Sequence, residues 1–284
     1  MSPVYNELRE ALLPRYEARE ARAVALLVLE DAFGVSRTDV YADKVRHFTE
    51  EEQRLLQNIL QRLAAGEPVQ YVLGRASFCG MSLRVTPATL IPRPETAELV
   101  DAAEAMAREW GEETPLRVLD GGTGSGCIAI ALASRLRHAA VEAWDVSDAA
   151  LDVARHNAAE QGVSVDFRHR DLLAPEGSEG HFHLIVSNPP YVTEREQGDM
   201  AAHVLDYEPH TALFVPDDDP LRFYRALAQL GRRSLLPHGA LAVEINQAFG
   251  PQTAELFRDA GLTDVTLRRD AYGHDRIVTA RQPH

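Results

Sequence analysis

Several residue types are scarce in this sequence of 284 residues, and each scarcity excludes a class of protein. With only two cysteines, Cys79 and Cys127, the chain has neither a disulfide framework nor a cysteine-rich zinc site. No apolar run reaches the roughly 18 residues that a membrane-spanning helix needs. The segment Met1–Arg9 is polar and charged, so we expect no secretory segment there. The eleven histidines show no metal-ligand spacing, so we predict no metal site. Taken together, these absences predict a cytoplasmic protein.

Positive charge is also scarce. Lysine and arginine together number 29 against 43 acidic residues, Lys44 is the only lysine, and the formal net charge is −14. An acidic surface repels the phosphate backbone of nucleic acids, so we expect neither direct nucleic-acid binding nor a membrane partner. Apolar residues make up 45% of the chain, enough for a substantial core in one large domain or two smaller ones.

The hydrophobic pattern divides the chain into three segments. Residues 1–74 carry Leu, Ala, Glu and Arg at helical spacing and predict a small all-helical domain with helices at 4–13, 17–33, 38–41 and 49–65. Residues 75–114 predict a β-hairpin around Cys79-Gly80 and a linker helix over 97–110. Residues 115–284 alternate strands with helices and end in two strands around a turn. This rhythm predicts an α/β fold with a doubly wound, mostly parallel, seven-stranded sheet. The predicted strands of this sheet span 117–119, 141–145, 165–169, 183–187, 240–245, 262–269 and 276–281.

A glycine-rich turn follows the first of these strands, between Val118 and Ala131. Its glycines permit positive φ and close approach of a ligand to the backbone, and the free N–H groups of the following helix favour an anion or a polar group. Asp145 ends the next strand, where a carboxylate can accept hydrogen bonds from ribose hydroxyls. The alternative for Asp145 is a helix N-cap. The predicted cofactor-binding residues of the turn are Gly122, Thr123, Gly124, Ser125 and Gly126.

The sequence Ser-Asn-Pro-Pro-Tyr follows the apolar stretch Phe182–Val186, which predicts a buried strand. Two consecutive prolines end the strand ladder and hold a stiff, extended turn. Such a turn leaves backbone carbonyls free beside the asparagine amide, which suits a planar group that carries an NH2, either an amide or an exocyclic amine. The alternative is an ordinary strand-ending turn with a buried tyrosine. The predicted catalytic and substrate-binding residues are Asn188, Pro189, Pro190 and Tyr191.

These two motifs, in this order and spacing, resemble those of class I S-adenosylmethionine-dependent methyltransferases, which have a Rossmann-like fold. Two further segments extend the resemblance over nearly the whole chain. Gly66–Gly74 (GEPVQYVLG) and Leu90–Thr96 (LIPRPET) are similar to signatures of the HemK-like family of release-factor glutamine-N5 methyltransferases. The departures from the family pattern, which bear on loop shape more than on chemistry, are Ala97, Gly121, Pro220 and Asn246.

The resemblance implies a substrate and a mechanism. The methyl donor would be S-adenosylmethionine, the product S-adenosylhomocysteine, and the acceptor the glutamine of a Gly-Gly-Gln loop in a peptide-chain release factor. The side-chain oxygen of Asn188 and the carbonyl of Pro189 would accept hydrogen bonds from the glutamine amide, with Asn188 also beside the cofactor. Tyr191 would pack against the amide or the sulfonium. Proximity and orientation would supply much of the acceleration.

Four further residues receive roles from the resemblance. Asp171 would accept a hydrogen bond from the adenine amine. Leu172 would contact the adenine ring or is a plain core leucine. Arg93 and Glu95 would contact the incoming protein loop, fix the hinge between the domains or form a structural salt bridge. The helical domain would dock the release factor, and the protein is expected to be a monomer.

Three other functions stay open at this point. An adenine-N6 nucleic-acid methyltransferase uses the same Asn-Pro-Pro-Tyr motif but predicts a basic cleft, which the net charge opposes. A glutamine methyltransferase of a ribosomal protein would differ in its N-terminal region. A non-catalytic cofactor sensor or scaffold would tolerate loss of Asn188 or Pro189, and both are present.

Overall fold

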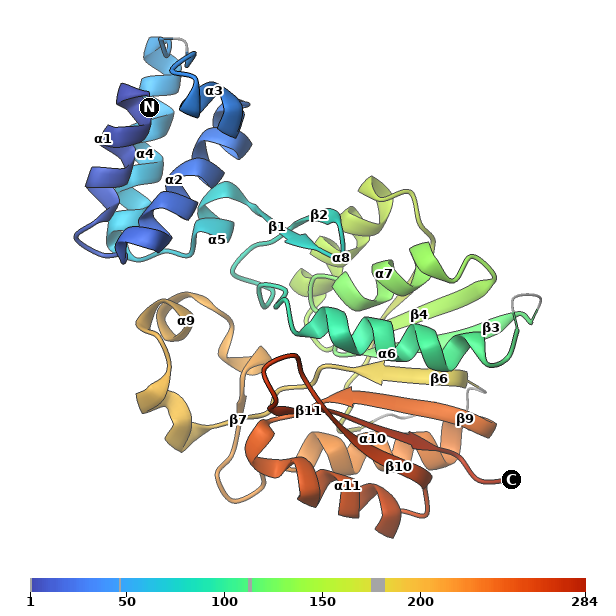
Figure 1. Ribbon diagram of the computed structural model, residues 1–284. Helices are drawn as coiled ribbons and strands as arrows, with labels where there is room; N and C mark the ends of the chain where they lie inside the picture. The colour runs from blue at the N-terminus through green and yellow to red at the C-terminus, as the bar shows by residue number, and fades with distance from the viewer. Residues whose placement is uncertain (1, 46, 112–113, 175–181) are drawn as a thin grey trace. The chain divides into compact units, whose positions relative to one another are not determined.

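The computed structural model describes residues 2–45, 47–111, 114–174 and 182–284, and the chain forms two compact units (Figure 1). The first unit comprises Met1–Arg75 and Ala201–Tyr207, and the second comprises Ala76–Met200 and Glu208–His284. The helical segment at the start of the chain therefore groups with a short stretch that comes much later in the sequence.

The first unit is helical, as the sequence predicts. Its helices are α1 (Pro3–Leu12), α2 (Ala18–Phe33), α3 (Arg37–Tyr41), α4 (Glu50–Ala65), α5 (Val69–Leu73) and α9 (Ala202–Tyr207). A capping box starts α4, where the Thr49 hydroxyl accepts from the Glu52 amide and the Glu52 carboxylate accepts from the Thr49 amide. Left-handed Gly34 and Gly66 end α2 and α4. The apolar faces of the helices meet in a core that includes fully buried Tyr5, Leu8, Leu29 and Leu63.

The second unit contains a seven-stranded sheet of order β10-β11-β9-β6-β3-β4-β5. Strands β9, β6, β3, β4 and β5 are parallel, and β11 is antiparallel to both β9 and β10. The mostly parallel sheet with a terminal antiparallel hairpin confirms the predicted fold class. The strands are β3 (Leu116–Gly121), β4 (Ala139–Asp145), β5 (Val165–His169), β6 (Phe182–Ser187), β9 (Leu235–Glu244), β10 (Thr263–Arg269) and β11 (Asp275–Arg281).

Helices cover both faces of this sheet (Figure 1). The helices α6 (Thr96–Arg108), α7 (Cys127–Arg135) and α8 (Asp148–Glu160) contribute to a core that includes Val118 and Leu184. The helices α10 (Arg222–Ser234) and α11 (Gly250–Asp259) contribute to a second core that includes Leu119 and Ile185. Neighbouring residues of one strand thus enter different cores, because successive side chains of a strand point to opposite faces. This is why the strands appear in the sequence as continuous apolar runs.

The strand order reverses beside β3. The chain passes from β3 to β4 and β5 on one side and then returns to place β6 on the other side. At such a switch point the connections leave the sheet in opposite directions and open a crevice at the carboxyl ends of the strands. Asp145 ends β4, and the glycine turn, Asp171 and Asn188 follow β3, β5 and β6 respectively. The topology therefore brings the separate sequence motifs to one edge of the sheet.

Some elements were absent from the sequence prediction. Besides α5 and α9, they are β7 (Val192–Thr193), which pairs in parallel with β8 (Phe214–Val215), and the 3-10 helices η1 (Glu194–Asp199), η2 (His210–Ala212) and η3 (Gln247–Phe249). Each is at most six residues long, too short to show a hydrophobic period. By contrast, the predicted hairpin is confirmed as β1 (Arg75–Phe78) paired with β2 (Met81–Arg84). Among the described residues, no helix has the length and apolarity to cross a membrane.

Candidate functional site

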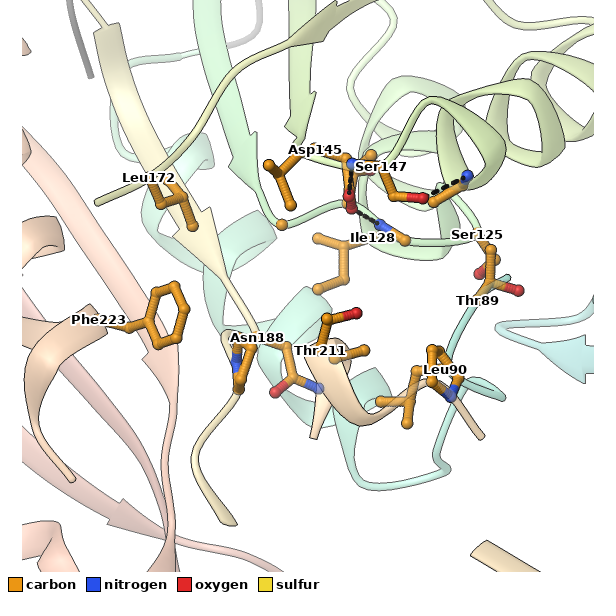
Figure 2. Close-up of a pocket in the computed structure, with 18 of the residues that line it drawn as sticks. Thr89, Leu90, Ser125, Ile128, Asp145, Ser147, Leu172, Asn188, Thr211 and Phe223 are labelled. Atoms are coloured by element: carbon orange, nitrogen blue, oxygen red, sulfur yellow. Dashed lines mark hydrogen bonds between the residues drawn. The ribbon is translucent and has the colours of Figure 1, made fainter. Parts of the chain in front are cut away.

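A cavity of about 370 Å³ lies in the second unit at the carboxyl ends of the parallel strands (Figure 2). This volume falls within the roughly 300–1,000 Å³ that small-molecule sites occupy. Of the residues singled out in the sequence, those that line it are Arg93, Gly122, Thr123, Gly124, Ser125, Asp145, Asp171, Leu172, Asn188 and Pro190. In the part of the chain that the structure describes, the lining does not include Glu95, Gly126, Pro189 or Tyr191.

The glycine turn has the backbone shape that its sequence predicts. Gly122, Gly124 and Gly126 have φ values of 72°, 55° and 83°, in the left-handed region that favours glycine. A Cβ atom at Gly124 would have no heavy atom within 4 Å, so the turn is open at that point. At Gly126 a Cβ would lie 2.9 Å from Ile130 Cδ1 and 3.1 Å from Ala154 Cβ. Gly126 therefore permits close packing of the turn against α7 and α8, whereas Gly122 and Gly124 face the cavity.

Asp145 is held at the cavity wall by two backbone amides. Its Oδ2 accepts a hydrogen bond from Gly124 N at 2.8 Å, and its Oδ1 accepts one from Ser147 N at 2.9 Å. The N-cap of α8 is Ser147, whose hydroxyl accepts from Ala150 N, so the helix-cap alternative for Asp145 is wrong. Burial raises the pKa of the Asp145 carboxyl, and the hydrogen bonds from the two amides partly oppose this rise. Each carboxylate oxygen keeps a lone pair for a ligand hydroxyl.

One wall of the cavity is apolar. Leu172 is buried and lines the cavity, together with Ile128 and Phe223 (Figure 2). Val146 also lines the cavity and is 57% exposed, which is unusual for a large apolar side chain beside a carboxylate. The sequence did not lead us to expect Ile128, Val146 or Phe223 at the cavity, although the position of Val146 directly after Asp145 was a usable signal. The wall suits a flat, weakly polar ring.

The Leu172 side chain also explains one departure from the family pattern. A Cβ atom at Gly121 would lie 2.9 Å from Leu172 Cδ2, closer than real Cβ contacts come. Leu172 thus occupies the space that a side chain at position 121 would need. An aliphatic residue there would require the end of the Leu172 side chain to shift.

The Asn-Pro-Pro-Tyr turn is fixed by hydrogen bonds that it donates to two other elements. Asn188 Nδ2 donates to the Thr96 hydroxyl at 3.2 Å, which leaves Oδ1 as the acceptor atom of the amide. The Tyr191 hydroxyl donates to Glu244 Oε1 at 3.1 Å, and burial raises the pKa of this phenol. Tyr191 is therefore a partly buried anchor of the turn, while Asn188 and Pro190 are its residues at the cavity. The sequence reading did not find the roles of Thr96 and Glu244.

Arg93 forms an ion pair at the cavity wall. Its guanidinium lies 2.6 Å from Glu208 Oε1, and the Glu208 side chain is fully buried. The second oxygen of Glu208 accepts from Ile91 N at 3.1 Å. The salt-bridge alternative for Arg93 is thus present in the structure, and one third of the Arg93 side chain stays exposed at the cavity.

Asp120 lies beneath the glycine turn, and its buried carboxyl group should make the stability of the protein depend on pH. Its Oδ2 accepts from the Thr123 hydroxyl at 2.6 Å and from Ala129 N at 3.1 Å, but its buried Oδ1 has no hydrogen-bond partner among the described residues. Burial raises the pKa of Asp120 to about 7. An unfolded aspartate titrates near pKa ~3.9. At pH values between these two pKa values, Asp120 is protonated in the folded protein and ionised in the unfolded chain. The stabilisation that comes from this proton is therefore lost as the pH rises through the folded-state pKa.

We therefore expect the free energy of unfolding of the wild type, relative to that of Asp120→Asn, to fall as the pH rises from about 5 to about 8. Denaturant titrations of both proteins across this range measure the difference. Above pH 8 the two curves should run parallel, because Asp120 is then ionised in both states. Curves that run parallel throughout the range would show that Asp120 titrates normally in the folded protein.

Comparisons with known proteins agree with this architecture. A model of the methyltransferase small domain matches residues 97–213, and a model of the PrmC N-terminal domain matches residues 5–74. A solved methyltransferase structure from Pyrococcus furiosus superposes with a TM-score of 0.51 at 17% identity, covering 84% of this chain and 100% of that one. This last likeness concerns the fold alone. The fold and the domain matches define a methyltransferase.

Whole-length relatives give the particular family. The release factor glutamine methyltransferase of Bacteroides thetaiotaomicron is 46% identical over 283 residues, which cover 99% of this chain and 100% of that protein. The enzyme of the same name from Flavobacterium psychrophilum is 39% identical, covering 95% of this chain and 94% of its own length. The chain belongs to the release factor glutamine methyltransferase family.

Proposed function

We propose that this protein transfers a methyl group from S-adenosylmethionine to the side-chain amide nitrogen (N5) of the glutamine in the Gly-Gly-Gln motif of peptide-chain release factors. The likeness to release factor glutamine methyltransferases over 99% of the chain carries this proposal. The orientation of the Asn188 amide at the cavity supports the chemistry.

The residues around the cavity fit the proposed cofactor. The open glycine turn leaves room for the methionine part, and the buried Ser125 hydroxyl lacks a hydrogen-bond partner among the described residues. Asp145 would accept hydrogen bonds from the ribose hydroxyls. Leu172 and its apolar neighbours would contact the adenine, and Asp171 at the cavity wall would accept from the adenine amine.

The acceptor amide would be held by the Asn-Pro-Pro-Tyr turn. S-adenosylmethionine supplies a methyl carbon bonded to a positively charged sulfur. Asn188 Oδ1 and the Pro189 carbonyl would accept the two N–H bonds of the glutamine amide and orient its nitrogen toward that carbon. Fixing the nitrogen in line with the bond that breaks supplies much of the acceleration. The glutamine nitrogen would take the methyl carbon, the electron pair of the broken S–C bond would remain on sulfur, and the nitrogen would then lose a proton to water.

The remaining parts of the chain have proposed roles as well. The helical segment 1–74 would dock the release factor, and the segment 115–284 would bind the cofactor. The segment 75–114 would connect these two segments. Arg93 and Glu95 would contact the incoming protein loop. We propose a cytoplasmic monomer that binds a protein substrate and does not bind nucleic acid directly, in line with the net charge of −14.

Transfer of label from S-adenosylmethionine to purified release factor tests the function. We expect label on the wild-type factor and none on a factor whose Gly-Gly-Gln glutamine is replaced. Label on both factors would place the acceptor elsewhere. Label on neither, with cofactor binding intact in calorimetry, would reject the release factor as substrate and direct the search to ribosomal protein and then to adenine-containing nucleic acid.

A further inference from the structure

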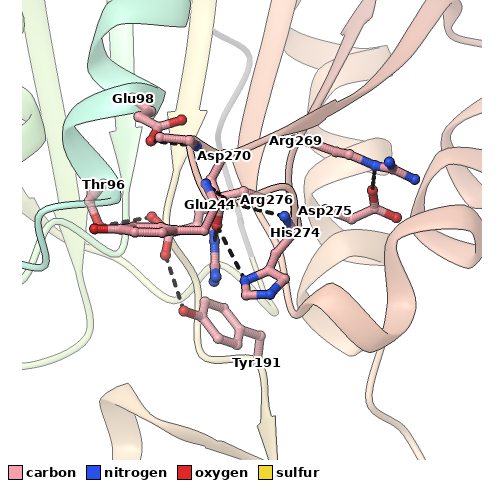
Figure 3. Close-up of polar contacts among 11 residues, drawn as sticks. Thr96, Glu98, Tyr191, Glu244, Arg269, Asp270, His274, Asp275 and Arg276 are labelled. Carbon is pink, nitrogen blue, oxygen red and sulfur yellow. Dashed lines mark hydrogen bonds and ion pairs between the residues drawn. The ribbon is translucent and has the colours of Figure 1, made fainter.

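A buried carboxylate lies directly behind the turn Asn188–Tyr191, which we call the acceptor turn. Glu244 is the last residue of β9, its side chain is buried, and both of its oxygens are used (Figure 3). Oε2 accepts a hydrogen bond from the Thr96 hydroxyl at 2.8 Å, and Oε1 accepts one from the Tyr191 hydroxyl at 3.1 Å. Burying a carboxylate is costly unless it is hydrogen-bonded. Here both hydrogen bonds come from residues that contact or belong to the acceptor turn.

The chemistry of these groups fixes the direction of each hydrogen bond. An ionised carboxylate only accepts, and a threonine hydroxyl has a single hydrogen. Thr96 donates that hydrogen to Glu244, so toward Asn188 it can only accept. The atom of Asn188 that faces Thr96, at 3.2 Å, must then be the NH2 group. A flipped amide would place two oxygen atoms together with no hydrogen between them.

Burial works against the ionised form of Glu244, and several neighbouring groups favour that form. Burial raises the pKa of Glu244, the nearby charge of Glu95 adds to the rise, and the hydrogen bonds from Thr96 and Tyr191 together with the charge of Arg276 oppose it. The Arg276 guanidinium is itself held by the buried Asp270, at 3.1 Å (Figure 3). The cation is thus fixed in place.

Asn246, which lies two residues after the end of β9, holds the backbone of the same turn. Asn246 Nδ2 donates to the Tyr191 carbonyl at 3.1 Å and to the Glu196 carboxylate, and Asn246 Oδ1 accepts from Ala248 N at 2.9 Å. The hydroxyl and the backbone carbonyl of Tyr191 are therefore both hydrogen-bonded to residues at or just after the end of β9. These hydrogen bonds depend on the side-chain amide of Asn246.

We propose that Thr96 and Glu244 are positioning residues that hold the Asn188 amide in one orientation, with Oδ1 presented to the acceptor nitrogen. The chain of hydrogen bonds runs from Asn188 through Thr96 to Glu244, and its single direction is set by the carboxylate. The kinetic part of this proposal rests on the proposed function, whereas the orientation of the amide does not.

Thr96→Val and Thr96→Ser form the matched pair that tests the role of the hydroxyl. Valine keeps the shape of threonine but cannot accept from Asn188, and serine keeps the hydroxyl. We expect Thr96→Val to lower kcat for release-factor methylation on the order of 10²-fold with a KM change below about threefold, since misplacing a reacting group costs about this much. Thr96→Ser should recover most of this loss. Thr266→Val, at an exposed position on β10, is the control.

Nuclear magnetic resonance of the ¹⁵N-labelled side-chain amides gives a readout that needs no substrate. The Asn188 signals are identified by their absence in Asn188→Ala. We expect one pair of signals in the wild type and in Thr96→Ser, and shifted or doubled signals in Thr96→Val. Thr96→Val with wild-type signals and wild-type kcat would overturn the proposal, and so would equal losses in both variants, which would assign the effect to packing.

Glu244→Gln tests separately whether the charge of the Glu244 carboxylate sets the direction of the hydrogen bonds to Asn188. A neutral glutamine can either accept from or donate to Thr96, so it permits both orientations of the Asn188 amide. We expect doubled Asn188 signals and an intermediate loss of kcat. A single set of signals with wild-type kcat would show that the carboxylate does not set the direction. A wild type that fails to methylate release factor while its Asn188 signals behave as expected would reject the proposed function and leave the positioning intact.

Discussion

Asn188→Ala is expected to lose methyl transfer by at least about 10²-fold while its affinity for S-adenosylmethionine stays within about threefold of the wild type. Asn188 lines the cavity and, with Nδ2 bound to Thr96 at 3.2 Å, has Oδ1 left for the acceptor. Alanine removes that acceptor and leaves the substrate amide without orientation, an effect typically worth 10²-fold or more. Single-turnover methylation of release factor measures the transfer step, and calorimetry measures the affinity.

Two further variants sharpen this result. Asn188→Asp keeps the size of the side chain but places an oxygen where Nδ2 donates to Thr96, and Thr96 has no second hydrogen to give it. We expect it to be as inactive as Asn188→Ala. Gln252→Ala, at an exposed position of α11, should be fully active. An active Asn188→Ala would remove Asn188 from the catalytic group altogether.

Asp145→Ala is expected to weaken the binding of S-adenosylmethionine and S-adenosylhomocysteine by about 10²-fold. The substitution removes the predicted partner of the ribose hydroxyls, and it also removes the acceptor that fixes Gly124 N and Ser147 N. Hydrogen bonds to a charged group contribute about 1.5–3 kcal/mol each, which is consistent with a loss of this size. Calorimetric titration of both ligands measures it.

The affinity should also depend on pH in a defined direction. Because burial raises the pKa of Asp145, acidification protonates this carboxyl earlier than an exposed aspartate and should weaken binding. Asp145→Ala should lack this part of the pH dependence. Asp152→Ala, at an exposed position one turn into α8, is the control. Unchanged affinity in Asp145→Ala would exclude this residue from the cofactor site.

The sequence allowed the sheet, its order of elements and the two main motifs to be predicted, because each depends on residues close together in the chain. The glycine turn and the Asn-Pro-Pro-Tyr turn are continuous, and their backbone shape follows from glycine and proline themselves. Strands such as β6 are marked by unbroken apolar runs. The predicted roles of these residues toward cofactor and substrate stay predictions that the variants above test.

The support behind the acceptor turn could not be predicted in this way. Thr96 and Glu244 are 148 residues apart in sequence, and each looks locally like an ordinary residue at a helix start or a strand end. Their hydrogen bond exists only because α6 packs beside the carboxyl end of β9. The region between Val192 and Val215 was missed for a different reason, since its short elements depend on single side chains such as Glu196, which caps η1.

The first unit is assembled from two stretches of chain that the ribosome makes at very different times. The helices up to α5 are synthesised first, whereas α9 follows only after β1–β7. The core residues of the helical unit all lie between Tyr5 and Val72, so its apolar cluster can close before α9 exists. When α9 is made, it adds surface contacts such as the hydrogen bond from the Tyr207 hydroxyl to the Ala65 carbonyl. During translation the helical domain can therefore mature early, as N-terminal domains generally do, and receive its last helix after most of the parallel strands of the second unit have been made.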